Sequence, residues 1–444
     1  MTTYKVFDIL CSSNILSAET CCFRFWRKEG VFVMHYDFDE IIDRRGTRAL
    51  NTDGFRSYIF KDVEGKKKFP FKDDEFIRMW VADMEFATPP EICRAMKDRI
   101  DRRIFGYTGL YDDSYYKVFS GWCKKMYDWE FPQEELTFSS GVIPALYEIV
   151  ENLVKDDEKV LITTPSYGFF QHAAEYSGKE YVCSPLRRDE DGHYTIDFED
   201  FAQKAADPTM KLVIWCNPHN PTGRVWTADE LKRVADIVEE NDLWIISDEI
   251  HCDLLRSGVR HLPMAKIMET YPRLITCMSA SKTFNMAGLM FSDIIIRDRK
   301  LRRTFVKRDK NVGGLNPISL AAHEAAYEHG GEWLKQMKAY LDGNFQYVHD
   351  FLAEKLPLIS FEIPESTYLA WVDMNPYLSD IADIPDFFAN KAGVLLEGGD
   401  GLFVGNAKGF VRLNLAMPRS LIEEGLNRIY EAVRKHSGSV PSAD

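Results

Sequence analysis

The chain has 444 residues, of which 45% are hydrophobic and 13% aromatic, and this is enough apolar material for a large core in two domains or one elaborated domain. Lysine and arginine total 55 against 69 aspartate and glutamate residues, which gives a formal net charge of -14. This charge excludes the basic surface that nucleic acids and anionic membranes require, so we expect neither as a partner.

The nine cysteines are scattered along the chain, with no Cys-x-x-Cys pair and no regular spacing. Their odd number argues against a disulfide framework, and their spacing argues against a zinc site. No apolar run is long enough to span a bilayer, and Asp8 interrupts the N-terminal stretch that a signal peptide would need. We therefore expect a cytoplasmic protein without a bound metal.

Residues 1–33 hold three of the nine cysteines and show neither helical nor strand periodicity. From Met34 onward, "MHYDFDEIIDRRGT" resembles an ordinary domain start. We expect residues 1–33 to form an N-terminal extension outside the fold. Two interpretations stay open: Met34 is the true first residue, or the segment is a genuine flexible extension.

The middle of the chain alternates buried strands with amphipathic helices. A helix is predicted from the apolar residues at 143, 146, 147, 150, 153 and 154, with Ser140 and Gly141 at its N-terminus. Strands are predicted to end at Pro165, before Pro218, near Asp248 and near Ser279. A capping box formed by Thr227 and Glu230 predicts a helix that continues to about Asn241.

This alternation predicts an α/β fold whose large domain, residues 84–324, contains a mostly parallel sheet with helices on both faces. Residues 34–83 and 325–437 are predicted to form a smaller α+β domain built from both chain ends. Ligands of such sheets bind beyond the carboxyl ends of the strands. Since Asn220, Asp248, Ser279 and Lys282 all follow strand ends, we expect them to share one cleft.

A single lysine, Lys282, stands among serines, a threonine and an asparagine in "CMSASKTFNMAGLM". A lysine in a partly desolvated pocket has a lowered pKa and forms a Schiff base with an aldehyde. Pyridoxal 5'-phosphate is the cofactor that this chemistry indicates. Its phosphate needs backbone amides and hydroxyls at a helix N-terminus, for which the candidates are Ser140, Gly141, Val142 and Ser279.

The cofactor ring needs three further partners. A carboxylate must keep the pyridine nitrogen protonated, and Asp248 at its strand end is the candidate. A donor must serve the ring oxygen, for which Asn220 and His251 are available. An aromatic side chain must cover one ring face, and Tyr167 follows a neighbouring strand.

Four segments in this order, "NPHNPTG", "SDEIH", "SASKTF" and "FVRLNLAMPR", resemble the signature of fold type I, class I/II aminotransferase-like pyridoxal-phosphate enzymes. Finer detail is similar to the MalY/PatB-type carbon-sulfur lyases, the cystathionine beta-lyase subgroup. The segments that carry this second resemblance are "FDEIIDRRGT", "MWVADMEFATPPEI", "FGYTG", "DEIHCDL", "SKTFNMAGL" and "STYLAWVDM", and the similarity runs from about Met34 to Ile429.

The resemblance implies a homodimeric lyase that acts on cystathionine or related S-substituted cysteines and releases pyruvate, ammonia and a thiol. It implies Lys282 as the Schiff-base lysine, Asp248 on the pyridine nitrogen, Asn220 on the ring oxygen and Tyr167 stacked on the ring. Arg412 would bind the substrate carboxylate with its bidentate fork. Tyr107 in "FGYTG" would reach the phosphate of the neighbouring subunit's cofactor, and Asn316 is a weaker candidate for the same contact.

Two departures from the wider family concern the cofactor. His251 stands where many aminotransferases of this fold carry tyrosine, which is similar to the lyase subgroup. Met290 stands where many carry a phosphate-binding arginine, so cofactor retention would depend more on the helix N-terminus, Ser279 and the partner's Tyr107. An aminotransferase is the alternative activity, because it shares every residue of the cofactor site. A catalytically idle regulatory scaffold is a third hypothesis.

Overall fold

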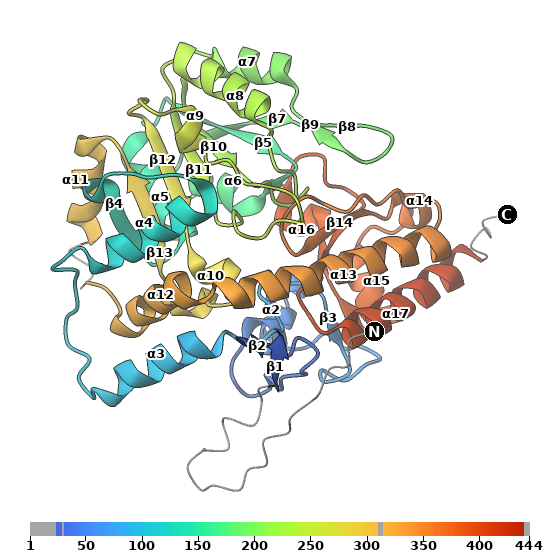
Figure 1. Cartoon of the computed structure of the whole chain (residues 1–444). Helices are drawn as coiled ribbons and strands as arrows, with labels where there is room; N and C mark the ends of the chain where they lie inside the picture. The colour runs from blue at the N-terminus through green and yellow to red at the C-terminus, as the bar shows by residue number, and fades with distance from the viewer. Residues whose placement is uncertain (1–23, 29–30, 310–313, 439–444) are drawn as a thin grey trace, which may run out of the picture.

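The computed structural model describes residues 24–28, 31–309 and 314–438. At its centre is a seven-stranded sheet with the strand order β4-β13-β12-β11-β10-β5-β7 (Figure 1). The strands from β12 to β7 run parallel to one another, and β13 is antiparallel to both of its neighbours. The strands are β4 (Leu136–Ser139), β5 (Lys159–Thr164), β7 (Glu180–Pro185), β10 (Met210–Cys216), β11 (Trp244–Asp248), β12 (Leu274–Met278) and β13 (Ser292–Ile296).

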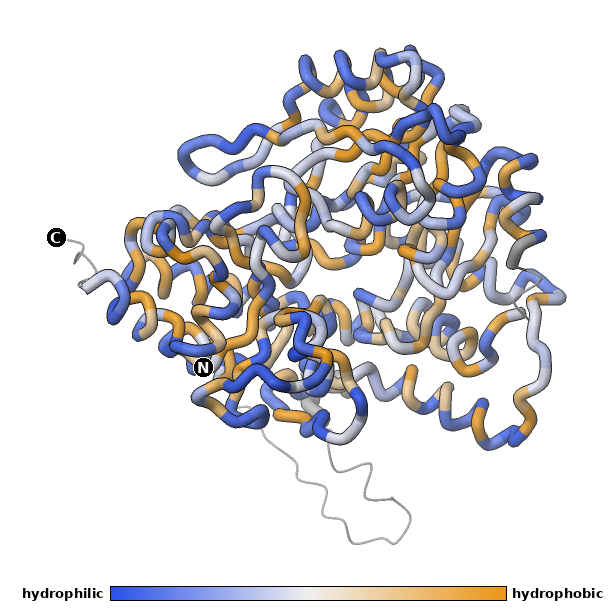
Figure 2. Tube along the Cα trace, turned by 180° about the vertical axis from the view of Figure 1, so that it is seen from behind, coloured by the Kyte–Doolittle hydropathy of each residue, from blue (hydrophilic) through white to orange (hydrophobic). Residues whose placement is uncertain are grey.

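Helices cover both faces of this sheet. One face packs against α5 (Val142–Leu153), α6 (Gly168–Glu175) and α11 (Arg299–Asp309). The other packs against α4 (Ser114–Tyr127), α7 (Phe198–Ala205), α8 (Ala228–Glu240) and α12 (Pro317–His329). Because both faces are covered, the central strands are continuously apolar rather than alternating. Figure 2 shows these apolar stretches in the interior and hydrophilic segments in the outer loops. This architecture confirms the predicted fold class.

The predicted capping box is present at the start of α8. The side chain of Thr227 accepts a hydrogen bond from the backbone N–H of Glu230 at 3.2 Å, and the Glu230 carboxylate accepts one from the Thr227 N–H at 2.8 Å. The helix ends at Glu240, one residue before the predicted end. The capping residues satisfy two amides that the first turn of a helix leaves free.

A second sheet has the antiparallel order β14-β18-β16, formed by β14 (Leu369–Asp373), β18 (Phe410–Asn414) and β16 (Glu397–Gly398). The long helix α13 (Gly331–Lys355) leads into this part and packs against the C-terminal helix α17 (Arg419–Ser437) (Figure 1). Both chain ends contribute to it, since Phe55, Phe76 and Trp80 pack against Ala389 and Leu395 in one apolar cluster.

Shorter elements complete the described chain. The helices are α1 (Leu50–Asp53), α2 (Phe55–Phe60), α3 (Pro90–Asp101), α9 (Met264–Ile267), α10 (Ala280–Thr283), α14 (Asn375–Leu378), α15 (Ile384–Lys391) and α16 (Gly399–Leu402), with 3-10 turns η2 (Gln133–Glu135) and η3 (Ala287–Leu289). The strands are β1 (Arg24–Lys28), β2 (Val31–His35), β3 (Ile77–Arg78), β6 (Ser166–Tyr167), β8 (Arg187–Arg188), β9 (Tyr194–Thr195), β15 (Val394–Leu395) and β17 (Phe403–Val404).

The predicted N-terminal extension, residues 1–33, falls partly outside the described residues, which begin at residue 24. Its strand β1 pairs antiparallel with β2, which continues past residue 33 to His35. Among the helices of the described segments, none combines the length and the apolar character that crossing a membrane requires. The division into residues 34–83 with 325–437 and residues 84–324 stays a prediction.

Candidate active site

The carboxyl ends of three parallel strands lie side by side in register. Cys216 at the end of β10 pairs with Asp248 at the end of β11, and Asp248 pairs with Cys277 in β12. The segments that follow these strands carry Asn220 and Lys282. This register brings Asn220, Asp248 and Lys282 to one edge of the sheet, as the positions of the strand ends predicted.

A cavity of about 210 Å³ opens at this edge. Most of the residues singled out in the sequence line it, namely Ser140, Gly141, Val142, Tyr167, Asn220, Asp248, His251, Lys282 and Arg412. The side chains come from different parts of the chain, and Arg412 belongs to β18 of the second sheet. The cavity therefore lies where the two sheets meet.

Two of the predicted site residues lie elsewhere. Ser279 is the N-cap of α10, and its hydroxyl accepts from Ser281 N and donates to the carbonyl oxygen of Phe291 at 2.8 Å. Ser281 lines the cavity in its place, which the sequence analysis missed. Tyr107 is 95% exposed on the isolated chain and does not face its own cavity.

Lys282 is half-buried, and its amine points to the loop that follows β3. Its Nζ donates a hydrogen bond to the carbonyl oxygen of Ala82 at 2.6 Å, and the Tyr368 hydroxyl donates to the same oxygen at 2.8 Å. Burial lowers the pKa of Lys282, and the charge of Arg412 acts in the same direction, although the charges of Asp83, Glu397 and Asp248 partly oppose the shift. A lowered pKa makes the neutral, nucleophilic amine more accessible.

The short helix that carries Lys282 is held by a buried carboxylate. Asp253 accepts a hydrogen bond from the Thr283 hydroxyl at 2.9 Å and from the indole N–H of Trp122 at 3.2 Å. It also accepts one from the hydroxyl of Tyr127. Asp253 therefore ties α10 to α4, a role that its sequence position beside His251 and Cys252 did not indicate.

Asp248 is a buried carboxyl group with few partners. Its Oδ1 accepts from the backbone N–H of Ile250 at 3.2 Å. Burial raises the pKa of Asp248 to about 7, and the charge of Lys282 opposes that shift only weakly. A cationic group in the cavity would favour the ionised carboxylate, so this position suits a protonated ring nitrogen.

The ring of His251 is neutral in this environment. Burial lowers the pKa of His251 to about 3, and the charges of Lys282 and Arg412 act in the same direction. Among the described residues, its Nδ1 has no hydrogen-bond partner. A neutral imidazole with one free nitrogen is suited to hydrogen-bonding a polar ligand.

Arg412 is almost fully buried, its guanidinium lies over the ring of Phe403 at 5.1 Å, and two side chains accept its hydrogen bonds. Its Nη1 donates to Oδ1 of Asn220 at 3.3 Å, and its Nη2 contacts the carboxylate of Glu397. Within the described part of the chain, its Nε has no partner. Because Asn220 accepts through its oxygen, its amide N–H groups remain able to donate to a ligand.

The loop that follows β3 is contacted by both the segment that carries Lys282 and the segment that carries Arg412. Asn285, three residues after Lys282, donates to the carbonyl oxygens of Met84 and Phe86 at 3.0 and 2.9 Å. Asn414, two residues after Arg412, donates to the carbonyl oxygen of Val81 at 2.8 Å. The loop that presents the Ala82 carbonyl is thus fixed by both functional segments.

These residues fit pyridoxal phosphate. The N-terminus of α5 meets the cavity through Ser140, Gly141 and Val142, where backbone N–H groups suit a phosphate. The unpartnered nitrogens of His251 and Arg412 are buried polar atoms that a polar ligand would satisfy. Met290 also lines the cavity, and no arginine occupies the place of the phosphate-binding arginine named above.

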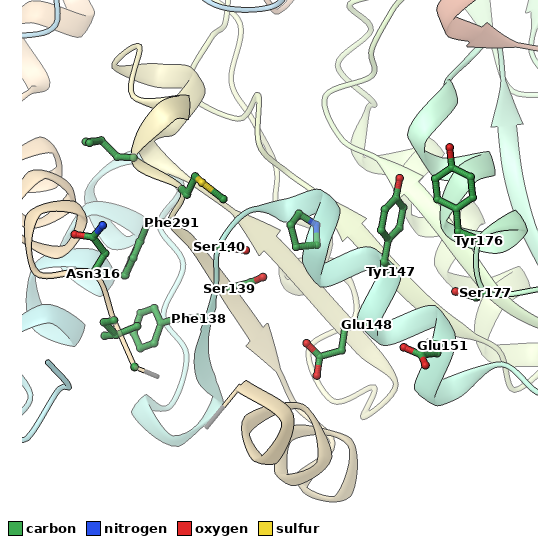
Figure 3. A pocket seen from close by; sticks show the side chains of 15 residues that line it. Phe138, Ser139, Ser140, Tyr147, Glu148, Glu151, Tyr176, Ser177, Phe291 and Asn316 are labelled. Atoms are coloured by element: carbon green, nitrogen blue, oxygen red, sulfur yellow. The ribbon is translucent and has the colours of Figure 1, made fainter. Parts of the chain in front are cut away.

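A larger cavity of about 780 Å³ adjoins the first and shares Ser140, Met290 and Phe291 with it. Figure 3 shows Phe291 and Asn316 on one side of this larger cavity and Tyr147 and Tyr176 on the other. The segment that carries Tyr107 meets its rim, because Thr108 forms a β-bridge with Leu315.

Comparison with known proteins agrees with this geometry. Residues 75–429 match the family model described as aminotransferase class I and II. The chain is 36% identical to "Cystathionine beta-lyase PatB" of Bacillus subtilis over 89% of its own length and 100% of the relative's. It is 30% identical to "Protein MalY" of Escherichia coli, covering 90% of this chain and 99% of that one.

Among solved structures, the PLP-bound C-S lyase from Staphylococcus hominis is 46% identical, with a TM-score of 0.84 over 90% of this chain and 98% of that chain. The fold is therefore that of fold type I pyridoxal-phosphate enzymes. The chain belongs to the class I and II aminotransferase family, as its sequence segments predicted. Its relatives include proteins named as cystathionine beta-lyases.

Proposed function

We propose that this protein is a pyridoxal-phosphate-dependent carbon-sulfur β-lyase that acts on cystathionine or related S-substituted cysteines. The observation that carries the proposal is one cavity lined by Lys282, the carboxyl group of Asp248 and the guanidinium of Arg412. Two relatives that the chain covers almost completely, one a curated protein and one a solved structure, are named as lyases of this type.

In this proposal each polar group of the cofactor has a partner. Gly141 and Val142 at the start of α5 would hold the phosphate, together with the hydroxyl of Ser281, which lines the cavity in place of Ser279. Asp248 holds the ring nitrogen, and Asn220 with His251 serves the ring oxygen. Tyr167 covers one ring face. When bound, the cofactor draws electrons away from the substrate's α-carbon and so accepts the charge that proton removal leaves there.

Lys282 and Arg412 act on the substrate itself. Arg412 binds its carboxylate, which orients the α-carbon toward the Lys282 amine. Lys282 removes the α-proton as general base, for which its lowered pKa is suited. The carbon-sulfur bond then breaks at the β-carbon, and the sulfur leaves as a thiol. The remaining three-carbon fragment is released and hydrolyses to pyruvate and ammonia.

We further propose an obligatory homodimer in which Tyr107 reaches the phosphate site of the partner. Tyr107 and Tyr111 are 95% and 92% exposed on the isolated chain, which is unusual for large aromatic side chains. The cavity beside the phosphate site is open and is lined by Asn316 and other residues of the rim. A second copy would bury these tyrosines and close that cavity.

We propose the cytoplasm as the location. The six cysteines whose side chains the structure describes are all free thiols, which fits a reducing compartment. We also propose that residues 34–83 and 325–437 form the smaller domain and residues 84–324 the larger one, with the cavity between them.

The discriminating experiment is incubation of the purified protein with cystathionine or cystine without a keto-acid acceptor, followed by a pyruvate assay. Pyruvate in the absence of an acceptor is the expected result. An aminotransferase would release no pyruvate and would turn over only once an acceptor is added, converting the substrate to its own keto acid with the carbon-sulfur bond intact. An idle scaffold would show no turnover in either mixture.

A further inference from the structure

The carboxylate of Glu397 lies against the guanidinium that is proposed to bind the substrate. Glu397 in β16 is the direct antiparallel partner of Arg412 in β18. Its carboxylate accepts from Nη2 of Arg412, and the two side chains are 4% and 1% exposed. This contact is a buried ion pair, whose strength solvent and salt reduce much less than that of a surface pair.

The two side chains that accept hydrogen bonds from Arg412 differ in their relation to the cavity, because Asn220 lines it and Glu397 does not. Nη2 is engaged by Glu397 and Nη1 by Asn220, whereas Nε has no partner among the described residues. Arg412 lines the cavity, and Glu397 is not among the residues that do. Glu397 therefore contacts the guanidinium from the side away from the cavity, and a ligand can approach Arg412 from within the cavity.

We propose that Glu397 is a positioning residue that fixes the orientation of Arg412 and weakens its affinity for the substrate carboxylate. This inference rests on the proposed role of Arg412 and deepens it. A carboxylate that enters the cavity meets a guanidinium whose charge Glu397 already balances, and the two buried carboxylates repel each other. Arg412 then orients the substrate without binding it tightly.

Weak binding of the ground state is useful in this position. Interactions that hold substrate and transition state equally well lower KM without raising kcat. Lys282 and Arg412 are the cations whose charges act on Glu397, and Lys282 is committed to the cofactor and the α-proton. Arg412 is therefore the cation that remains to bind the ligand. The negative charge of Glu397 offsets its positive charge, so the pair as a whole attracts a carboxylate less strongly than Arg412 alone would.

The test measures the Kd of propionate for the cofactor-loaded protein by calorimetry. Propionate has the carboxylate of the substrate but no amine, so it cannot bond to the cofactor aldehyde. Glu397→Gln keeps the shape and an oxygen acceptor for Arg412 but removes the negative charge. We expect its Kd for propionate to be lower than that of the unmodified protein by roughly fivefold or more.

Matched controls separate charge from packing. Propionamide, the neutral analogue, should bind the glutamine variant and the unmodified protein equally. Asp373→Asn removes the acid of the Arg188–Asp373 pair, 3.4 Å apart and outside the cavity, and should leave the Kd of propionate unchanged. Glu397→Met removes the charge and the hydrogen bond together, so its gain in affinity should be smaller than that of the glutamine variant.

Equal or weaker binding of propionate by both Glu397 variants overturns the inference, as does equal tightening for propionamide. A methionine variant that binds as tightly as the glutamine variant overturns the positioning role. Arg412→Met that binds propionate like the unmodified protein refutes the assignment of Arg412 itself. Absence of pyruvate in the lyase assay leaves all these binding results intact, so the two failures are distinguishable.

Discussion

At the residue scale, burial determines the charges in the cavity. Asp248, His251 and Lys282 all have pKa values moved by burial toward their neutral forms, the first to about 7 and the second to about 3. Without a ligand, the site therefore holds an imperfectly satisfied carboxyl group beside a lysine. Such a site is destabilising by itself and is suited to a cationic ring nitrogen.

Asp248→Asn should stabilise the cofactor-free protein at high pH. The raised pKa means that, between about pH 4 and 7, folded Asp248 binds more protons than the unfolded chain, so its ionisation destabilises the fold as pH rises through about 7. Replacing this carboxyl group by an amide should raise the free energy of unfolding by roughly 3 kcal/mol at pH 8 and by less at pH 5.

Urea unfolding of the cofactor-free protein at the two pH values measures this difference. Asp191→Asn, at an exposed position of the loop between β8 and β9, is the control and should change stability by less than about 0.5 kcal/mol. The substitution at Asp248 should also lower kcat of the loaded enzyme. A variant no more stable than the unmodified cofactor-free protein at pH 8 would contradict the assigned burial cost.

The site residues that the sequence predicted differ from those it did not predict in what places them at the site. Lys282, Asp248 and Asn220 follow strand ends, and parallel strands bring such positions together by topology alone. Glu397 escaped because only its register opposite Arg412 reveals it, and that register depends on a strand of two residues. Ala82 escaped because its contribution is a backbone carbonyl, which no residue type indicates.

At the element scale, the strands and helices around the site were predicted where an apolar run or a helical apolar face was clear in the sequence. Four buried strands ended within about two residues of their predicted ends, because proline, aspartate or serine follows each apolar run. The short strands β3, β15, β16 and β17 were not predicted. They have two residues each, and tertiary contacts rather than local pattern define them.

Thr227→Ala should destabilise the fold by about 1 kcal/mol, because it removes the side-chain acceptor for the Glu230 N–H at the start of α8. Denaturant unfolding with an unchanged m-value measures this loss. Thr304→Ala is the matched control, since Thr304 lies within α11 and is exposed. Its expected change is within about 0.5 kcal/mol, and equal losses for the two variants would contradict the capping role.

At the scale of the whole molecule, the proposed homodimer requires that two copies share each site. The cavity beside the phosphate site, about 780 Å³, and the exposed Tyr107 on the neighbouring segment are complementary features of one chain. Neither could be located from sequence, because exposure is a property of the folded surface. The tyrosine itself was identified by its place in "FGYTG".

Mixing two impaired variants tests this sharing. Lys282→Ala removes the base from its own site, and Tyr107→Ala weakens the partner's site. In a mixed dimer, one site has both Lys282 and the partner subunit's Tyr107, so exchange of subunits should restore about a quarter of the native sites. Activity that stays at the sum of the two separate variants would show that Tyr107 acts within its own chain or has no role.

The most direct measurement for the central claim is reduction of the protein with borohydride after incubation with pyridoxal phosphate, followed by peptide mapping with mass spectrometry. We expect a stable pyridoxyl adduct on Lys282 and its loss in Lys282→Ala. Absence of any adduct, or an adduct confined to other lysines, would contradict the claim that the Lys282 amine holds the cofactor at the edge of the parallel sheet.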